Sequence, residues 1–235
     1  YFDKAVAILE AIDEADAAVA DRGSEAQGRL RVSVPVEFGR RIIAPHLGRL
    51  LERHPGLEIS LSLSDEVSDL LSEQIDVSVR LGSSVVSDDI VSKRLGDFQR
   101  WVVASPEYLT RTGLPRTPRD LLEHQCLRFD YRTGHHNWTF QGDEEVIRLN
   151  VQGRLKSNNA DILREAALAG GGVALLADWL VREDVSAGRL TRVLEQYEVN
   201  PGSASTCINA LYLPNHRGSS RINVFIEFLQ EILAP

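Results

Sequence analysis

Two short segments hold the residues best placed for chemistry, because in each of them a strand gives way to a helix. The first contains Pro35, Val36, Glu37 and Phe38, and the second contains Asn158 and Asn159. The first turn of a helix has backbone N–H groups without intrahelical partners and a partial positive charge, so it attracts carboxylates and phosphates. Ligands of open α/β sheets lie beyond the carboxyl ends of strands. Both segments are therefore candidate contacts for a small anion or polar molecule.

Four further residues follow predicted strands in the same way. These are Ser83 and Ser84 after Val77–Leu81, and Asp178 and Trp179 after Val173–Leu176. The two serines are either ligand contacts or ordinary loop hydroxyls. The tryptophan is either an aromatic wall of the site or part of the core. One of the two adjacent asparagines should cap the following helix, which leaves the other for a ligand.

Arg80 is a further candidate, because it lies near the end of a predicted strand. Its guanidinium could bind a carboxylate through two parallel hydrogen bonds. The alternative is a salt bridge within the chain, for which Asp76 is the nearest acid in the sequence.

Signatures of catalysis and of metal binding are missing from the sequence. It contains no G-x-S-x-G, H-E-x-x-H, G-x-G-x-x-G or G-x-x-x-x-G-K-[ST] motif. His135 and His136 lie in a polar stretch without a third ligand at a suitable spacing. Cys126 and Cys207 are far apart, so we expect two reduced thiols, with a redox switch as the alternative. We therefore expect no enzyme, no cofactor and no metal site.

The apolar pattern predicts a mixed α/β chain. The first part of the chain predicts a parallel sheet of three strands, the second of them at Leu57–Leu63. A helix containing Pro45 should connect the first two strands, and a short helix marked by Val67 should connect the second and third. The remaining predicted elements are strands at Trp101–Ala104, Leu127–Phe129, Trp138–Phe140, Val146–Leu155, Val173–Leu176 and Ile208–Leu213, and helices at Pro106–Arg111, Pro118–Glu123, Ala160–Ala169 and from Ser219 or Ser220 onward. The run Gly170–Gly172 should end the helix before it.

Composition narrows the class of protein. The chain has 235 residues, 43% of them hydrophobic, and a formal net charge of −8, which argues against nucleic-acid binding by this chain alone. No apolar run is long enough for a membrane span. This absence, with that of a signal segment, leads us to expect a cytoplasmic protein. The chain has no methionine and begins at Tyr1, from which we expect a fragment.

The first 27 residues predict a charged helix with a thin apolar stripe, formed by Phe2, Leu9, Ile12 and Val19. Such a stripe needs a partner surface. A second subunit is one possibility, and packing against the chain's own body is the other.

Several short motifs, in their order and spacing, carry a family resemblance over nearly the whole chain. They are Gly28–Ser33, Phe38–Gly39, Pro45, Asp76–Gly82, Ala104–Leu109, Ser157–Asn159 and Gly171–Leu176. With them the chain resembles the linker helix and effector-binding domain of a LysR-type transcriptional regulator. The resemblance implies a two-lobed, periplasmic-binding-protein-like (type 2) α/β fold, with two crossover strands joining the lobes and a long linker helix before them. It implies a linker helix at 1–27, lobe I at 28–101 plus 209–235, and lobe II at 102–208.

The resemblance also implies a function. A small-molecule effector would bind between the lobes, and DNA would be bound only through a winged helix-turn-helix domain N-terminal to this chain. The linker helices would pair in a homodimer or homotetramer. A solute-binding protein of a transport system shares the fold and is the main alternative, followed by an α/β enzyme.

Overall fold

The structure is a computed structural model that describes residues 26–65, 74–82, 89–131, 137–143 and 145–234. The predicted linker helix with its stripe, the short helix marked by Val67, and Ser83 and Ser84 lie outside the described residues. The strands are β1 (Gly28–Val34), β2 (Leu57–Leu63), β3 (Val77–Leu81), β4 (Val91–Asp97), β5 (Arg100–Ala104), β6 (Cys126–Phe129), β7 (Asn137–Gln141), β8 (Val146–Asn150), β9 (Lys156–Ser157), β10 (Val173–Ala177), β11 (Thr191–Val193), β12 (Glu198–Pro201) and β13 (Cys207–Tyr212). The α-helices are α2 (Val36–Phe38), α3 (Leu47–Arg53), α4 (Pro106–Thr112), α5 (Ala160–Leu168), α6 (Asp178–Ser186) and α7 (Ser220–Leu233).

The described residues fall into two compact units. Unit 1 comprises those up to Gly96 together with those from Ile208, and unit 2 comprises 97–207. These bounds lie within a few residues of the lobes that the resemblance implies. The chain therefore passes between the units twice, once after β4 and once before β13.

Unit 1 contains a five-stranded sheet in the order β2-β1-β3-β13-β4 among the described residues. β1 runs parallel to both β2 and β3, with Val32 beside Val77 in register, and β13 runs antiparallel to β3. The strand–helix–strand arrangement predicted from the apolar pattern is confirmed here. It brings the carboxyl ends of β1, β2 and β3 to one edge of the sheet.

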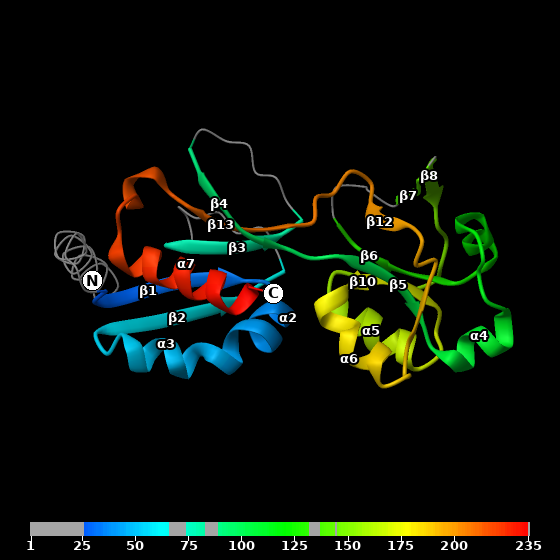
Figure 1. Ribbon diagram of the computed structural model, residues 1–235, viewed down its shortest axis with the longest axis horizontal. Helices are drawn as coiled ribbons and strands as arrows, with labels where there is room; N and C mark the ends of the chain where they lie inside the picture. Colours follow the sequence, from blue (N-terminus) through cyan, green and yellow to red (C-terminus); the bar gives the residue numbers. More distant parts are fainter. Residues whose placement is uncertain (1–25, 66–73, 83–88, 132–136, 144, 235) are drawn as a thin grey trace, which may run out of the picture. The chain divides into compact units, whose positions relative to one another are not determined.

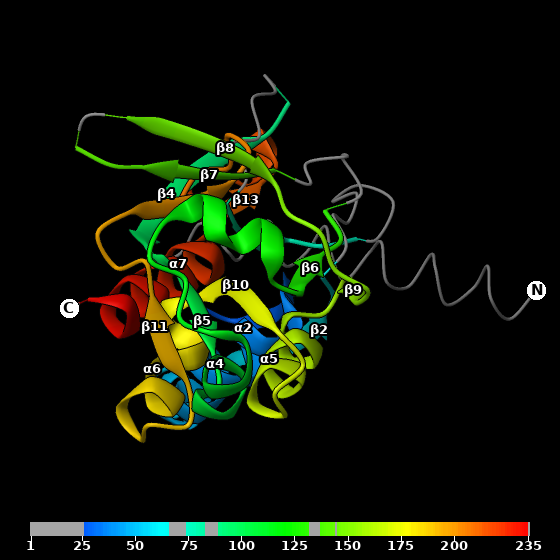
Figure 2. The same ribbon diagram turned by 90° about the vertical axis from the view of Figure 1, so that its right-hand side faces the viewer.

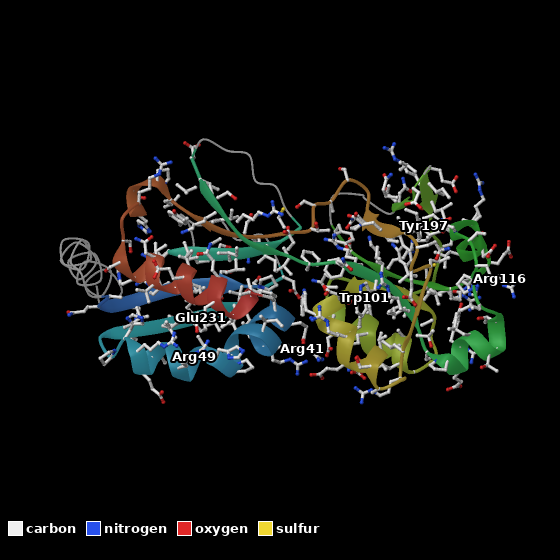
Figure 3. All side chains as sticks on the ribbon, in the orientation of Figure 1. Arg41, Arg49, Trp101, Arg116, Tyr197 and Glu231 are labelled. Atoms are coloured by element: carbon white, nitrogen blue, oxygen red, sulfur yellow. The ribbon has the colours of Figure 1, made fainter. Side chains whose placement is uncertain are left out.

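Helices cover the apolar face of the unit 1 sheet. Figure 1 shows α7 lying along β1, and its Phe225, Ile226 and Leu229 are fully buried. Ser219 is the N-cap of α7, since its hydroxyl accepts a hydrogen bond from the Ile222 N–H at 3.3 Å. Glu231 of α7 pairs with Arg49 and Arg53 of α3 (Figure 3), so this exposed cluster joins the two helices.

The helical segment after β1 changes its winding twice. A π-helical turn at Gly39–Ile43 and a 3₁₀ turn at Ala44–His46 separate α2 from α3. Pro45 lies in the 3₁₀ turn, where its missing N–H breaks the α-helical ladder, as its place in the sequence predicts. In α3, Leu50 is buried whereas the adjacent Leu51 is 40% exposed.

Unit 2 contains two sheets among its described residues. A five-stranded sheet has the order β11-β5-β10-β6-β9, and a three-stranded antiparallel sheet has the order β12-β7-β8. Figure 2 shows β7 and β8 side by side. Alternate residues of the larger sheet pack into two different hydrophobic cores. On one face, Val102 and Leu175 pack with Trp138 and Phe140 of the smaller sheet. On the other face, Val103 and its neighbours pack against α5 and α6.

Some predicted elements differ from the observed ones. The strand predicted at Val146–Leu155 ends at Asn150, because the chain there crosses closely over β6. A Cβ on Gly153 would lie 1.8 Å from the Cys126 carbonyl oxygen, so only glycine fits. The sequence analysis did not identify β4, β11, β12 or α6. Three of these are short or edge strands whose polar residues hide the alternation.

Candidate functional site

The helix start after β1 is already occupied by the chain's own carboxylate. The Val36 N–H donates a hydrogen bond to Asp65 Oδ1 at 3.0 Å, and Asp65 follows the carboxyl end of β2. The anion-binding N–H predicted at this junction therefore has an internal anion within reach. Asp65 was not among the residues expected from the sequence, although its position just beyond a strand end was a signal that could have identified it.

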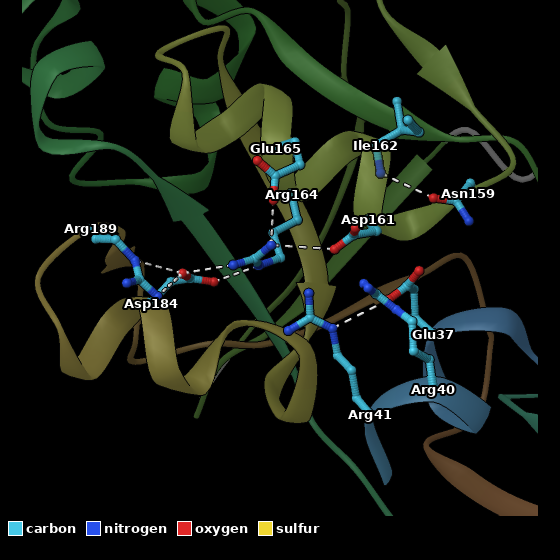
Figure 4. Close-up of polar contacts among 10 residues, drawn as sticks. All are labelled: Glu37, Arg40, Arg41, Asn159, Asp161, Ile162, Arg164, Glu165, Asp184 and Arg189. Carbon is cyan, nitrogen blue, oxygen red and sulfur yellow. Dashed lines mark hydrogen bonds and ion pairs between the residues drawn. The ribbon is translucent and has the colours of Figure 1, made fainter. Parts of the chain in front are cut away.

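The other residues of the first junction have defined surroundings. Phe38 is fully buried in the core and Pro35 is partly buried. Glu37 is only 8% exposed, and its Oε2 accepts hydrogen bonds from Arg40 Nη2 at 2.7 Å and Arg41 Nε at 3.3 Å (Figure 4). The junction thus presents a buried carboxylate held by two arginines.

Arg80 belongs to a buried polar row on the face of the unit 1 sheet that carries Ser33 and Ser78. Its Nη2 donates to Ser33 Oγ at 3.1 Å, and the guanidinium is almost wholly buried. Asp76 accepts a hydrogen bond from the Arg31 backbone N–H at 2.7 Å. Ser33 and Ser78 are register partners, so β1 and β3 build this row together.

The second predicted junction begins α5, and Asn159 is its N-cap. The Asn159 side chain accepts a hydrogen bond from the Ile162 N–H at 3.1 Å (Figure 4), while its own N–H donates to Ser157 Oγ. This settles which of the two asparagines caps the helix. Asn158 is exposed and lies just before the cap, at the carboxyl end of β9.

Asp178 and Trp179 open α6 directly after β10. Asp178 is 8% exposed, its Oδ1 accepts a hydrogen bond from the Gln99 N–H at 3.0 Å, and its own N–H donates to the Gln99 carbonyl. This pair of bonds joins the start of α6 to the segment before β5. Trp179 packs against the core beneath α5 and α6, as the core alternative predicted.

An arginine also lies at this sheet edge of unit 2. Arg100, the first residue of β5, is the register partner of Ala177, the residue before Asp178. Its Nη1 donates to Asn200 Oδ1 at 2.6 Å and to the Ser205 carbonyl at 3.2 Å. Burial lowers the pKa of the Arg100 guanidinium, and the nearby Tyr131 hydroxyl offsets this in part. The sequence analysis missed Arg100; the signal was a charged residue opening an apolar strand.

Other candidate chemistry is limited within the part of the chain that the structure describes. No cluster of three or more His, Cys, Asp and Glu side chains there is arranged to hold a metal ion. No helix among those residues is long and apolar enough to cross a membrane. Cys126 is buried, which raises the pKa of its thiol to about 12, and Cys207 is partly buried. A thiol with so high a pKa is a poor nucleophile at neutral pH.

Comparison with known proteins identifies the family. The model of the LysR substrate binding domain matches residues 23–234. The HTH-type transcriptional regulator YhjC of Escherichia coli K12 is 32% identical over 240 residues, which cover 99% of this chain and 77% of the relative. DmlR, an HTH-type transcriptional regulator of the same strain, is 29% identical over 99% of this chain and 74% of its own length.

Solved structures agree with the sequence relatives. CrgA of Neisseria meningitidis, a LysR-type transcriptional regulator, matches with a TM-score of 0.79 and 27% identity over 100% of this chain and 78% of its own. Its regulatory domain alone matches with a TM-score of 0.77 and 28% identity over 88% of this chain and 100% of its own. Proteins of this class are typically not enzymes. The chain therefore belongs to the LysR substrate-binding-domain family, as the effector-sensing regulatory domain of a LysR-type transcriptional regulator.

Proposed function

We propose that this regulatory domain binds a small anionic effector at the carboxyl ends of its strands. The observation that supports this best is the position of Arg100 beside Ala177 at the carboxyl end of β10, with Asn158 just beyond β9 at the same edge of the larger unit 2 sheet. Ligands of α/β sheets lie at such edges. The proposed contacts in lobe I are Pro35, Val36, Glu37, Ser83 and Ser84, without the buried Phe38, and Asn159 and Trp179 are neighbours in lobe II.

Effector binding would act by shifting an equilibrium between two arrangements of the lobes. A ligand shifts such an equilibrium only as far as its affinities for the two arrangements differ. In this proposal the change reaches a winged helix-turn-helix domain N-terminal to the chain, which binds DNA in the cytoplasm. The named relatives are called transcriptional regulators, which disfavours the transport alternative.

A thermal-shift screen of this chain against small organic acids and their neutral amides tests the proposal. A ligand at 100 times its Kd should add about 2.7 kcal/mol to the free energy of unfolding. X-ray scattering with and without the stabilising acid should then show a change in the radius of gyration. Stabilisation by amides alone, or an acid that binds without any change in scattering, would contradict the proposal.

DNA binding by this chain alone is not expected, because the sequence is acidic overall. A mobility-shift assay with the DNA upstream of its own gene is the check. Sequence-specific retardation of that DNA at physiological salt would contradict the assignment of DNA binding to another domain.

Self-association is a further part of the proposal, with the stripe of Phe2, Leu9, Ile12 and Val19 as one contact surface. Burial of three or four such side chains per helix contributes roughly 1.5–3 kcal/mol each before ordering costs. Replacing Leu9 and Ile12 by Asp should weaken association in sedimentation, while replacing the exposed Leu114 by Asp serves as a control. An unmodified chain that sediments as a monomer at micromolar concentration would refute this role.

A further inference from the structure

Arg100 is held by neutral groups alone among the described residues. Its Nη1 bonds Asn200 Oδ1 and the Ser205 carbonyl, and Tyr131 supplies a hydroxyl. The guanidinium also lies over the Phe98 ring, 4.6 Å from its centroid. None of these partners carries a negative charge to balance the arginine. Arg100 is partly buried, and taking a charge out of water without a counter-charge is costly, so its surroundings favour an anion beside the guanidinium.

The guanidinium has donor capacity left for such an anion. Arginine has five N–H donors in a rigid fork. The two on Nη1 reach Asn200 and Ser205, and one more reaches Tyr131, which leaves two in the plane of the group. Two donors of one guanidinium match the two oxygens of a carboxylate.

Two buried hydroxyls belong to residues next to these contacts, one in the chain and one in the sheet register. Ser205 Oγ and Thr139 Oγ1 are buried without a hydrogen-bond partner. Ser205 is the residue whose carbonyl receives the arginine, and Thr139 is the register partner of Asn200. Burial raises the pKa of Tyr131, so its hydroxyl keeps its proton and remains able to donate to an anion. Unpaired buried hydroxyls in a native structure require an explanation, which a bound ligand would supply.

We infer that Arg100 and Tyr131 bind the carboxylate of the effector, on the side of the unit 2 sheet that faces β12. This inference rests on the proposed function and deepens it, because it names the residue that selects an acid over its neutral analogue. It moves the anion receptor away from the helix starts, where Asp65 and Asn159 already accept the N–H groups of Val36 and Ile162.

Calorimetric titration with matched acids and amides tests the inference. The probes are benzoate and succinate against benzamide and succinamide, and the variants are Arg100→Gln, Arg100→Lys and Tyr131→Phe. Arg100→Gln removes hydrogen bonds between charged groups, so it should weaken binding of the preferred acid at least about tenfold. Arg100→Lys should restore part of that loss, since it keeps the charge but not the fork. Tyr131→Phe should have a smaller effect.

Arg192→Gln is the matched control, because it removes an arginine that lies over the Trp101 ring at 4.7 Å on the adjacent strand β11. It should leave acid binding within about twofold, well below the tenfold step of about 1.4 kcal/mol. Circular dichroism of each variant establishes that it is folded, and Tyr131→Phe removes one hydroxyl only, so it stays informative if the Arg100 variants unfold.

Three outcomes would overturn the inference. They are equal acid binding by the wild type and Arg100→Gln, amide binding as tight as acid binding, and no acid binding by the wild type at millimolar concentration. The first leaves the proposed function standing with its anion receptor elsewhere. If amides and the wider screen also fail to stabilise the chain, the proposed function falls as well.

Discussion

Two arginines of unit 2, the buried Arg164 and the partly buried Arg100, have opposite surroundings. Arg164 of α5 donates from Nε and Nη2 to Asp184 of α6 at 2.6 and 2.9 Å, with Asp161 and Glu165 also in reach. Arg100, in contrast, donates hydrogen bonds to neutral acceptors, which are Asn200 Oδ1 and the Ser205 carbonyl. The hydrogen bond to Asp184 raises the pKa of Arg164, whereas burial lowers the pKa of Arg100.

The difference separates a structural arginine from a candidate ligand-binding one. The Arg164–Asp184 pair joins two helices and has its counter-charge within the chain, so it is complete without a ligand (Figure 4). Arg100 has no such counter-charge among the described residues. Perturbed groups that lack an internal explanation cluster at functional sites.

Removing the counter-charge of the structural arginine should have the largest effect. Asp184→Ala removes the buried counter-charge of Arg164 and leaves only Asp161 and Glu165 beside it, and breaking a buried pair costs about 3–5 kcal/mol. Urea unfolding measures the loss. Glu183→Ala, next to it but exposed, is the control and should change the free energy of unfolding little. Equal stability of the two variants would show that the pair is not structural.

The two arginines themselves should differ when each is replaced by methionine. Arg164→Met leaves the Asp184 carboxylate without its main buried partner, whereas Arg100→Met removes an uncompensated charge and strands only neutral acceptors. We expect Arg164→Met to lower the free energy of unfolding by about 2 kcal/mol more than Arg100→Met does. If the Arg100 variant is the less stable one, its role is structural and the contrast fails.

Loss of the helix cap should have an intermediate effect. Asn159→Ala removes the acceptor of the Ile162 N–H and should cost about 1 kcal/mol of stability. Asn158→Ala is the matched control and should leave the free energy of unfolding unchanged, because its side chain is exposed. A greater loss of stability in the Asn158 variant would reverse the assignment of the cap.

Lowering the pH from neutral to mildly acidic should slightly lower the free energy of unfolding of unit 2. Burial lowers the pKa of His124, whose Nδ1 lies 3.2 Å from the Tyr108 hydroxyl, while Asp120 and Glu123 offset this in part. A lowered pKa favours the neutral ring in the folded state. Stability is therefore complete above the ordinary pKa of 6.5 and declines as the pH falls below it. Unfolding curves between neutral pH and pH about 5 should show this decline, and His124→Gln should flatten it.

Sequence patterns predicted the fold better than the site. Strands with clear alternation, such as β2, and the helix after Ser219 were found with nearly correct bounds, because burial imposes a period on their residues. The edge strand β4 was missed because Val91 and Leu95 are its only large apolar residues, so its sequence shows no alternation. The sequence could not show that Asp65 and Asn159 accept the N–H groups of the two helix starts, because this depends on the folded positions of their side chains. It could not show the neutral surroundings of Arg100 either, because Asn200 lies 100 positions away in the chain.

The most direct test of the contrast is a ¹H–¹⁵N spectrum of the arginine Nε–H groups during titration with benzoate or succinate. Arg100→Lys and Arg164→Lys each remove one resonance and so assign the two signals. We predict that the Arg100 resonance shifts saturably with the acid, does not respond to the corresponding amide, and that the Arg164 resonance stays in place. An unmoved Arg100 resonance while the acid binds, or an equal shift of both resonances, would contradict the account.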